Sequence, residues 1–155
     1  MPQLNKGGKF VFGLSEISSK YTIQIPEPAL RMYGVANDDK IIIFTGSKIT
    51  GGFCVTSKKL LSQSKLKHIL DECPELSTYS INEGDFIRYK GRGYSWLFIS
   101  SSGIVQLTKG SMEYLNLKVG HQLMCIKSSD IAFTMGAEGP LMDKVHNYKG
   151  TIDLY

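Results

Sequence analysis

The sequence predicts a mainly β protein of the α+β class, with short helices, built from two tandem copies of one unit. Three observations predict it: an internal repeat at an offset of 82 positions, short stretches in which apolar residues alternate, and Gly, Asn or Pro at the ends of helix-like stretches. The chain has 155 residues, of which 42% are hydrophobic and 21% charged, so it is long enough to bury a core.

The repeat is clearest where Ile23-Gln24-Ile25-Pro26 aligns with Val105-Gln106-Leu107-Thr108. The same offset, without a gap, aligns further apolar pairs: Leu30 with Met112, Val35 with Leu117, Ile41 with Leu123, and Ile43 with Cys125. Identity is low, but the order of apolar and turn-like positions matches. Duplication of one unit is the better interpretation.

The first copy contains four strand-like stretches around one short helix. We expect strands over 9–12, 21–25 and 41–44, and a fourth after the turn at 46–48. The helix is expected over 28–33, since Pro28 lies near its start and Gly34 just past its end.

The second copy repeats this order. Its expected strands cover 94–99 and 103–107, its helix covers 111–115 and ends at Asn116, and a turn at 128–130 precedes the last strand. A helix follows each copy: 58–73, capped by Ser57, and 141–148, after Gly139-Pro140.

These elements divide the chain into four segments: the first unit at 1–56, a helix and linker at 57–78, the second unit at 79–137, and a C-terminal helix and tail at 138–155. One unit alone buries too little apolar area to offset its conformational entropy, so the two are expected to share a core. The expected core residues are Phe10, Phe12, Ile23, Ile25, Leu30, Ile41, Ile43, Phe44, Phe98, Val105, Leu107, Met112, Leu123 and Ile126.

The run from Ile23 to Phe44 resembles the SpoVT/AbrB-like family, whose units consist of a strand, Ile-Pro, a short amphipathic helix, Gly-apolar, an acidic turn and a strand. Ile25-Pro26, Leu30-Arg31, Gly34-Val35 and Asp39 occupy the matching positions. The resemblance covers about residues 9–55 and reaches about 94–135 through the repeat. With two copies in one chain, the protein is similar in tandem layout to the MraZ proteins.

This resemblance implies two swapped-hairpin units that form one pseudo-symmetric β-barrel. It also implies a transcriptional regulator that binds double-stranded DNA and needs no cofactor. Tandem units allow either a closed monomer or a strand-exchanged homodimer or higher homo-oligomer.

The expected DNA-binding residues fall into two groups. The resemblance implies a role for Arg31 alone, where the family has a helix arginine; Lys20, just before the turn where the family shows Gly-Arg, and Lys9 could join a basic face. The second group is Arg88, Lys90 and Arg92, the only basic cluster undiluted by acids in a chain of net charge +4. Aromatic residues alternate with these cations, as suits contact with phosphates and bases.

Two alternatives remain open at this stage. The stretch 86–96 is also consistent with a solvated hairpin whose cations alternate outward around a tight turn at Gly91–Gly93. The chain departs from the family at Thr22, where an arginine is common, and at Glu113, which is opposite Arg31 in the repeat. A non-enzymatic protein-interaction or assembly module that has lost DNA binding is therefore the second hypothesis.

Other functional classes are not expected. Cys54, Cys73 and Cys125 are widely spaced and lie beside no histidine at metal-ligand spacing, so we predict no metal site. No residues suggest a catalytic arrangement, and we predict no enzyme activity. The start of the chain lacks the apolar core of a signal peptide, and no apolar run could span a bilayer, which predicts a cytoplasmic protein without membrane contact.

Overall fold

The computed structural model describes residues 10–155 and has an α+β architecture of mostly antiparallel sheet with short helices, as the sequence predicts. The strands are β1 (Val11–Glu16), β2 (Thr22–Gln24), β3 (Lys40–Thr45), β4 (Phe53–Thr56), β5 (Ile87–Tyr89), β6 (Arg92–Phe98), β7 (Ile104–Gln106), β8 (Gln122–Lys127) and β9 (Phe133–Gly136). The helices are α1 (Glu27–Tyr33), α2 (Lys58–Ser62), α3 (His68–Glu72), α4 (Pro74–Ser77), α5 (Lys109–Tyr114) and α6 (Pro140–His146), and one 3₁₀ turn, η1, covers Val35–Asn37.

Seven strands form one antiparallel sheet in the order β1-β8-β9-β4-β3-β6-β5, and β2 pairs with β7 in a separate two-stranded sheet. The large sheet ends at β1 and β5 and does not close into a barrel. The closed barrel implied by the family resemblance is therefore not seen in the strand pairing.

The first half of the fold, residues 11–62, and the second half, residues 92–146, exchange strands. β1 of the first half pairs with β8 of the second, and β6 of the second pairs with β3 of the first. The registers correspond: Ile41 faces Leu97 in one pair, and Leu123 faces Ser15 in the other. Residues 82 positions apart in these strands are therefore equivalent, and each half completes the sheet of the other.

An approximate two-fold axis relates the halves. It passes between β2 and β7, where the equivalent residues Ile23 and Val105 face each other, and between β4 and β9, where Cys54 faces Thr134. In β4 and β9 the offset is 80, because the β8–β9 connection is two residues shorter than the β3–β4 connection.

The two faces of the large sheet bury different apolar residues, because side chains alternate along a strand. Ile41 and Ile43 belong to the main core, on what we call the inner face, together with residues of α1, α5, β2 and β7. Ile42 and Phe44 lie on the outer face. All four residues Ile41–Phe44 are buried, so this apolar run is covered on both faces.

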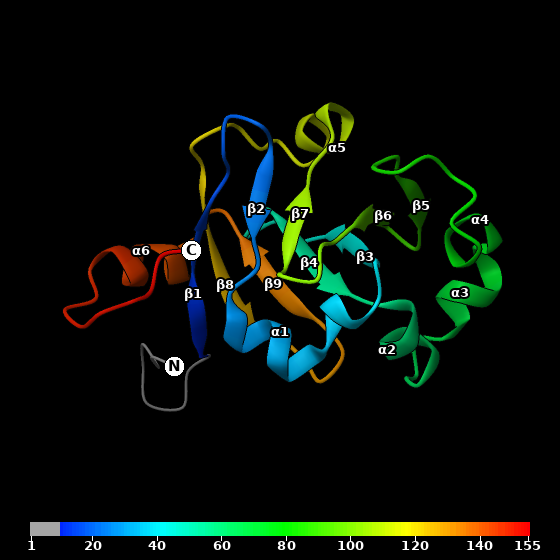
Figure 1. Ribbon diagram of the computed structural model, residues 1–155, viewed down its shortest axis with the longest axis horizontal. Coiled ribbons are helices and arrows are strands. Elements are labelled where there is room, and N and C mark those ends of the chain that lie inside the picture. Colours follow the sequence, from blue (N-terminus) through cyan, green and yellow to red (C-terminus); the bar gives the residue numbers. More distant parts are fainter. Residues whose placement is uncertain (1–9) are drawn as a thin grey trace.

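Separate groups of helices cover the outer face. Residues of α2, α3 and α4, including Leu61 and Ile69, pack against Ile42 and Phe44. Helix α6 packs against β1 and β8 through Met142 and Val145. Figure 1 shows these two groups at opposite ends of the molecule, with the sheet between them.

Helix ends follow local chemistry as predicted. Gly34 ends α1 with φ +65°, and Asn116, just after α5, has φ +55°, the left-handed conformation that these two residue types tolerate best. The Ser57 hydroxyl caps α2 by accepting a hydrogen bond from the Leu60 amide.

The predicted helix 58–73 is wrong, because the segment forms α2 and α3 with a break between them. In the break, the Ser64 hydroxyl donates to the Leu61 carbonyl (2.9 Å) and accepts from the Leu66 amide (3.0 Å). Such local side-chain bonds compete with the helical hydrogen bonds and favour a turn.

Two predicted core residues are also wrong: Phe10 and Phe98 are 39% and 45% exposed. Phe10 precedes β1, which covers Val11–Glu16 rather than the predicted 9–12. Phe98 lies at the end of β6, where its ring contacts Trp96 and the Lys40 ammonium group.

Within the described part of the chain, no helix is long and apolar enough to traverse a lipid bilayer.

Candidate functional site: a basic hairpin and an adjoining cleft

A hairpin at one edge of the sheet carries three cations in close succession. Lys90 and Gly91 join β5 to β6, and their φ angles are +48° and +84°. Positive φ at both central residues is typical of the type I′ turn, which fits the twist of paired strands. The predicted tight turn at Gly91–Gly93 is displaced, since Gly93 lies within β6, opposite Arg88. Lys90, which is not part of the predicted turn, occupies a central position of the observed turn with a left-handed backbone.

The hairpin presents its cations in different directions. Arg88 faces Gly93 and Tyr89 faces Arg92 across the strands, so Arg88 and Arg92 lie on opposite faces. Lys90 is at the tip, with its ammonium nitrogen 5.4 Å from the centroid of the Tyr89 ring. All three cations are exposed, as predicted for residues that contact a polyanion.

Carboxylates do not neutralise these cations. The described residues form two ion pairs, Arg31 with Glu27 and Lys40 with Asp39, and neither includes a hairpin residue. A nearby carboxylate, Glu72, instead accepts a hydrogen bond from the Tyr89 hydroxyl. The positive charge of the hairpin is therefore available to an external anion.

Lys20 lies elsewhere, in the exposed turn between β1 and β2. Its backbone carbonyl accepts a hydrogen bond from the Gln106 side-chain amide at 2.7 Å. The equivalent Gln24 makes the same bond to the Ser102 carbonyl at 2.8 Å. Both turns are thus held across the two-stranded sheet, but only the first one carries a cation.

Arg31 is exposed on α1, and its Nε atom lies 3.7 Å from Oε1 of Glu27 in the preceding turn of the helix. Lys9 lies outside the described residues. The structure therefore places Arg88, Lys90 and Arg92 on one hairpin, with Arg88 and Arg92 on opposite faces, whereas Lys20 and Arg31 lie on separate elements. Figure 1 shows the β5–β6 hairpin, the β1–β2 connection and α1 in different parts of the molecule.

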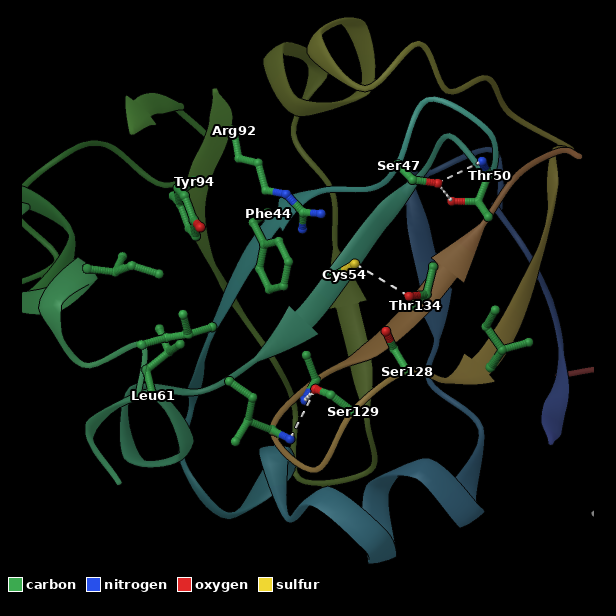
Figure 2. A pocket seen from close by; sticks show the side chains of 15 residues that line it. Phe44, Ser47, Thr50, Cys54, Leu61, Arg92, Tyr94, Ser128, Ser129 and Thr134 are labelled. Atoms are coloured by element: carbon green, nitrogen blue, oxygen red, sulfur yellow. Dashed lines mark hydrogen bonds between the residues drawn. The ribbon is translucent and has the colours of Figure 1, made fainter. Parts of the chain in front are cut away.

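Beside the hairpin, the outer face of the sheet contains a cleft of about 460 Å³. Figure 2 shows it between the sheet and the α2–α3 segment, with Arg92 and Phe44 at one side. Its lining residues come from β3, β4, β6, β8, β9, the adjoining loops and the α2–α3 segment: Phe44, Ser47, Thr50, Cys54, Leu61, Leu66, Ile69, Arg92, Tyr94, Ile126, Ser128, Ser129, Ile131, Ala132 and Thr134.

The cleft combines one cation with hydroxyl groups and apolar walls. The Arg92 guanidinium lies 5.4 Å from the centroid of the Phe44 ring, within the range of a cation–π contact. Five lining residues carry aliphatic hydroxyls: Ser47, Thr50, Ser128, Ser129 and Thr134. Among the described residues that line the cleft there is no carboxylate and no histidine. This arrangement can bind an anion.

Some of these hydroxyls already have partners. The hydroxyls of Ser47 and Thr50 lie 3.1 Å apart, and the Cys54 sulfur lies 3.4 Å from the Thr134 hydroxyl. The Ser129 hydroxyl accepts backbone hydrogen bonds within its own turn. These bonds hold the side chains in place at the cleft wall, as the dashed lines in Figure 2 show.

Tyr94 forms a second aromatic wall. Its ring stacks on Phe44, with centroids 5.5 Å apart and planes at 30°. Burial raises the pKa of the Tyr94 hydroxyl, and this outweighs the opposite effect of the nearby Arg92. The hydroxyl is therefore neutral at physiological pH.

Of the residues that line this cleft, only Arg92 was predicted from the sequence to have a functional role. The other lining residues are distant in the chain, and serine, threonine and leucine at irregular spacing carry no motif. The repeat held a partial signal, since Ser47 and Ser129 are equivalent and both line the cleft.

Comparisons with known proteins do not assign this chain to a family. No protein-family model matches this sequence, and no curated protein matches it.

Proposed function

We propose that this protein is a DNA-binding transcriptional regulator that contacts duplex DNA through the β5–β6 hairpin. The observation that carries the proposal is the group of three exposed cations without carboxylate partners among the described residues. Lys and Arg side chains of this kind contact phosphates, which supply most of the affinity for non-specific duplex.

The proposal includes the fold relationship that suggested it. The reciprocal pairing of β1 with β8 and of β3 with β6 supports two swapped-hairpin units of the SpoVT/AbrB-like type. In that arrangement the two-stranded sheet of β2 and β7 would supply the remaining wall of a barrel around the main core.

The test is fluorescence anisotropy with a labelled mixed-sequence duplex, at 50 and at 200 mM salt. If three cations displace counterions, a plot of log K against log salt has a slope of roughly −2.7, and affinity falls about 40-fold over this range. The variant R88Q/K90Q/R92Q should lose most of the binding and most of the salt dependence.

The matched control is K59Q/K65Q/K118Q, which removes the same charge from exposed lysines outside the hairpin. We expect the control to bind within about twofold of the unmodified protein at 200 mM salt, where long-range effects are screened. An equal loss in both variants would mean that net charge alone drives binding. Absence of binding at 50 mM would overturn the DNA proposal.

A second candidate is a protein-interaction or assembly module on the same fold, in which two copies form a homodimer or higher homo-oligomer. It is favoured by the position equivalent to Arg31, where Glu113 is exposed, and by the pairing of Arg31 itself with Glu27. This hypothesis predicts an oligomer in light scattering that is insensitive to salt and nuclease. A monomer at all concentrations, together with salt-dependent DNA binding, would exclude it.

A further inference from the structure

We propose that the outer-face cleft binds a small organic acid, an oxyanion attached to a flat apolar body, with Arg92 holding the anionic group. This site shares Arg92 with the proposed DNA surface, but the inference does not depend on DNA binding. The evidence is the size, charge and wall composition of the cleft.

The size suits a small molecule. A cleft of about 460 Å³ falls within the roughly 300–1,000 Å³ typical of small-ligand sites. Its apolar walls come from both layers: Leu61, Leu66 and Ile69 from the α2–α3 segment, and Ile126 from the sheet. These side chains can cover both sides of a flat ring system.

The charge selects an anion. Arg92 is the one ionised side chain among the described lining residues, and no carboxylate lies there to oppose an acid or to attract a cation. The guanidinium lies against the Phe44 ring, and Figure 2 shows it directed toward the side of the cleft where Ser47 and Thr50 lie. A guanidinium presents a planar fork of donors that matches a carboxylate or a phosphate.

Neutral donors complete the site. The Ser128 side chain forms no hydrogen bond with any described residue, although it lines the cleft. The Tyr94 hydroxyl is neutral at physiological pH, so it does not repel an anion. An oxyanion seated between Arg92 and these hydroxyls would place its apolar body against Phe44 and the leucines.

Direct titration by calorimetry tests this with naphthalene-2-carboxylate, its neutral carboxamide and 2-naphthyl phosphate. The carboxylate should bind one per chain, and about 10-fold more tightly than the carboxamide, as expected for one charge-assisted hydrogen-bonded pair. Tighter binding of the phosphate would assign the natural ligand to the phosphate esters, and tighter binding of the carboxylate to the carboxylic acids.

Three variants make the test specific. R92Q should remove the preference for carboxylate over carboxamide, whereas K65Q, a loss of equal charge at an exposed neighbour of the cleft, should retain it. L66W, at a side chain that is 40% exposed and therefore tolerant of substitution, should fill the cleft mouth and weaken all three probes at least 10-fold.

Equal affinity for the carboxylate and its carboxamide would overturn the proposal, as would a preference that survives R92Q or an absence of saturable binding. No DNA is present in the titration, so failure here would leave the DNA proposal standing. If both proposals hold, the two anions compete for Arg92, and naphthalene-2-carboxylate must lower the affinity for duplex by the same factor as duplex lowers the affinity for the carboxylate.

Discussion

The first and second halves of this protein, residues 11–62 and 92–146, use one strand register but carry different surfaces. Ile41 and Leu123 occupy equivalent places in equivalent pairs, and the two-fold axis brings Ile23 opposite Val105. At the surface, Arg31 of the first half corresponds to Glu113 of the second. The shared core constrains both halves at once, because each half completes the sheet of the other, whereas surface positions are free to diverge.

The cleft shows the same contrast within one site. Three equivalent pairs line it on both sides of the axis, namely Phe44 with Ile126, Ser47 with Ser129 and Cys54 with Thr134. The cation and the aliphatic wall are not duplicated, since Arg92, Leu61 and Ile69 have no equivalents there. The site lies on the two-fold axis but is asymmetric, because Arg92 at the start of β6 and the side chains of the α2–α3 segment have no equivalents among its lining residues.

The largest effect on stability is expected where equivalent residues have different backbone conformations. Gly52 has φ +63°, and a Cβ there would overlap the Met135 carbonyl; its equivalent across β4 and β9 is Ala132, which is not among the described residues with positive φ. We expect Gly52→Ala to lower the free energy of unfolding by roughly 3 kcal/mol or more. Urea unfolding measures this, and Ala132→Gly, at about 1 kcal/mol, is the control. Similar losses in both variants would contradict the asymmetry.

The next effect depends on pH. Tyr33, equivalent to Leu115, donates its hydroxyl to the Ser129 carbonyl at 2.6 Å, and burial raises its pKa to about 12. A raised pKa in the folded state means that the protonated tyrosine stabilises fully below pH 10 and that this contribution is lost as pH rises toward 12. Across that window the unmodified protein should lose roughly 2–3 kcal/mol relative to Tyr33→Phe. Parallel stability curves for the two proteins between pH 9 and 12 would refute it.

The helices of the two halves begin differently. Thr108 caps α5 by accepting from the Ser111 amide at 3.0 Å, while the equivalent Pro26 makes no such bond at α1. Thr108→Ala should therefore lower the free energy of unfolding by about 1 kcal/mol. Thr108→Ser keeps the oxygen and should restore most of it. Equal denaturation midpoints for the alanine and serine variants would show that the cap contributes nothing.

The smallest effect concerns a hydroxyl in the core. Ser95 is fully buried, its hydroxyl has no partner among the described residues, and the equivalent residue is Gly13. Replacing it with alanine removes an unsatisfied group, so Ser95→Ala should change stability by less than about 0.5 kcal/mol or raise it slightly. In contrast, Ser15→Ala removes a hydroxyl that donates to the Gln24 carbonyl at 2.6 Å and should cost about 1 kcal/mol. Urea midpoints compare the two, and a larger loss from Ser95→Ala would reveal a hidden partner.

Much of the fold followed from local patterns. The Ile-rich run at 41–44 predicted a buried strand, and Gly34 and Asn116 marked the ends of two helices. The prediction was weaker where polar residues lie in strands: β1 continues through Ser15 and Glu16 because they pair with β8, which no local propensity indicates.

The candidate site could be predicted from the sequence only in part. The cation cluster was visible because Arg88, Lys90 and Arg92 alternate over five positions. Their division between two faces was not, since it depends on a turn in which Lys90 has positive φ. The cleft was invisible because its walls join residues from Phe44 to Thr134.

Spacing and residue type in the chain were sufficient to predict the α+β class, the 82-residue repeat and the places where most short helices begin or end. These features depend on contacts within a few residues, which a linear sequence displays directly. The register in which β1 pairs with β8 and β3 with β6, the open edges of the large sheet and the cleft around Arg92 depended on tertiary structure alone. Each arises from contacts between residues tens of positions apart, and the free energy of those contacts depends on how both halves pack around one core.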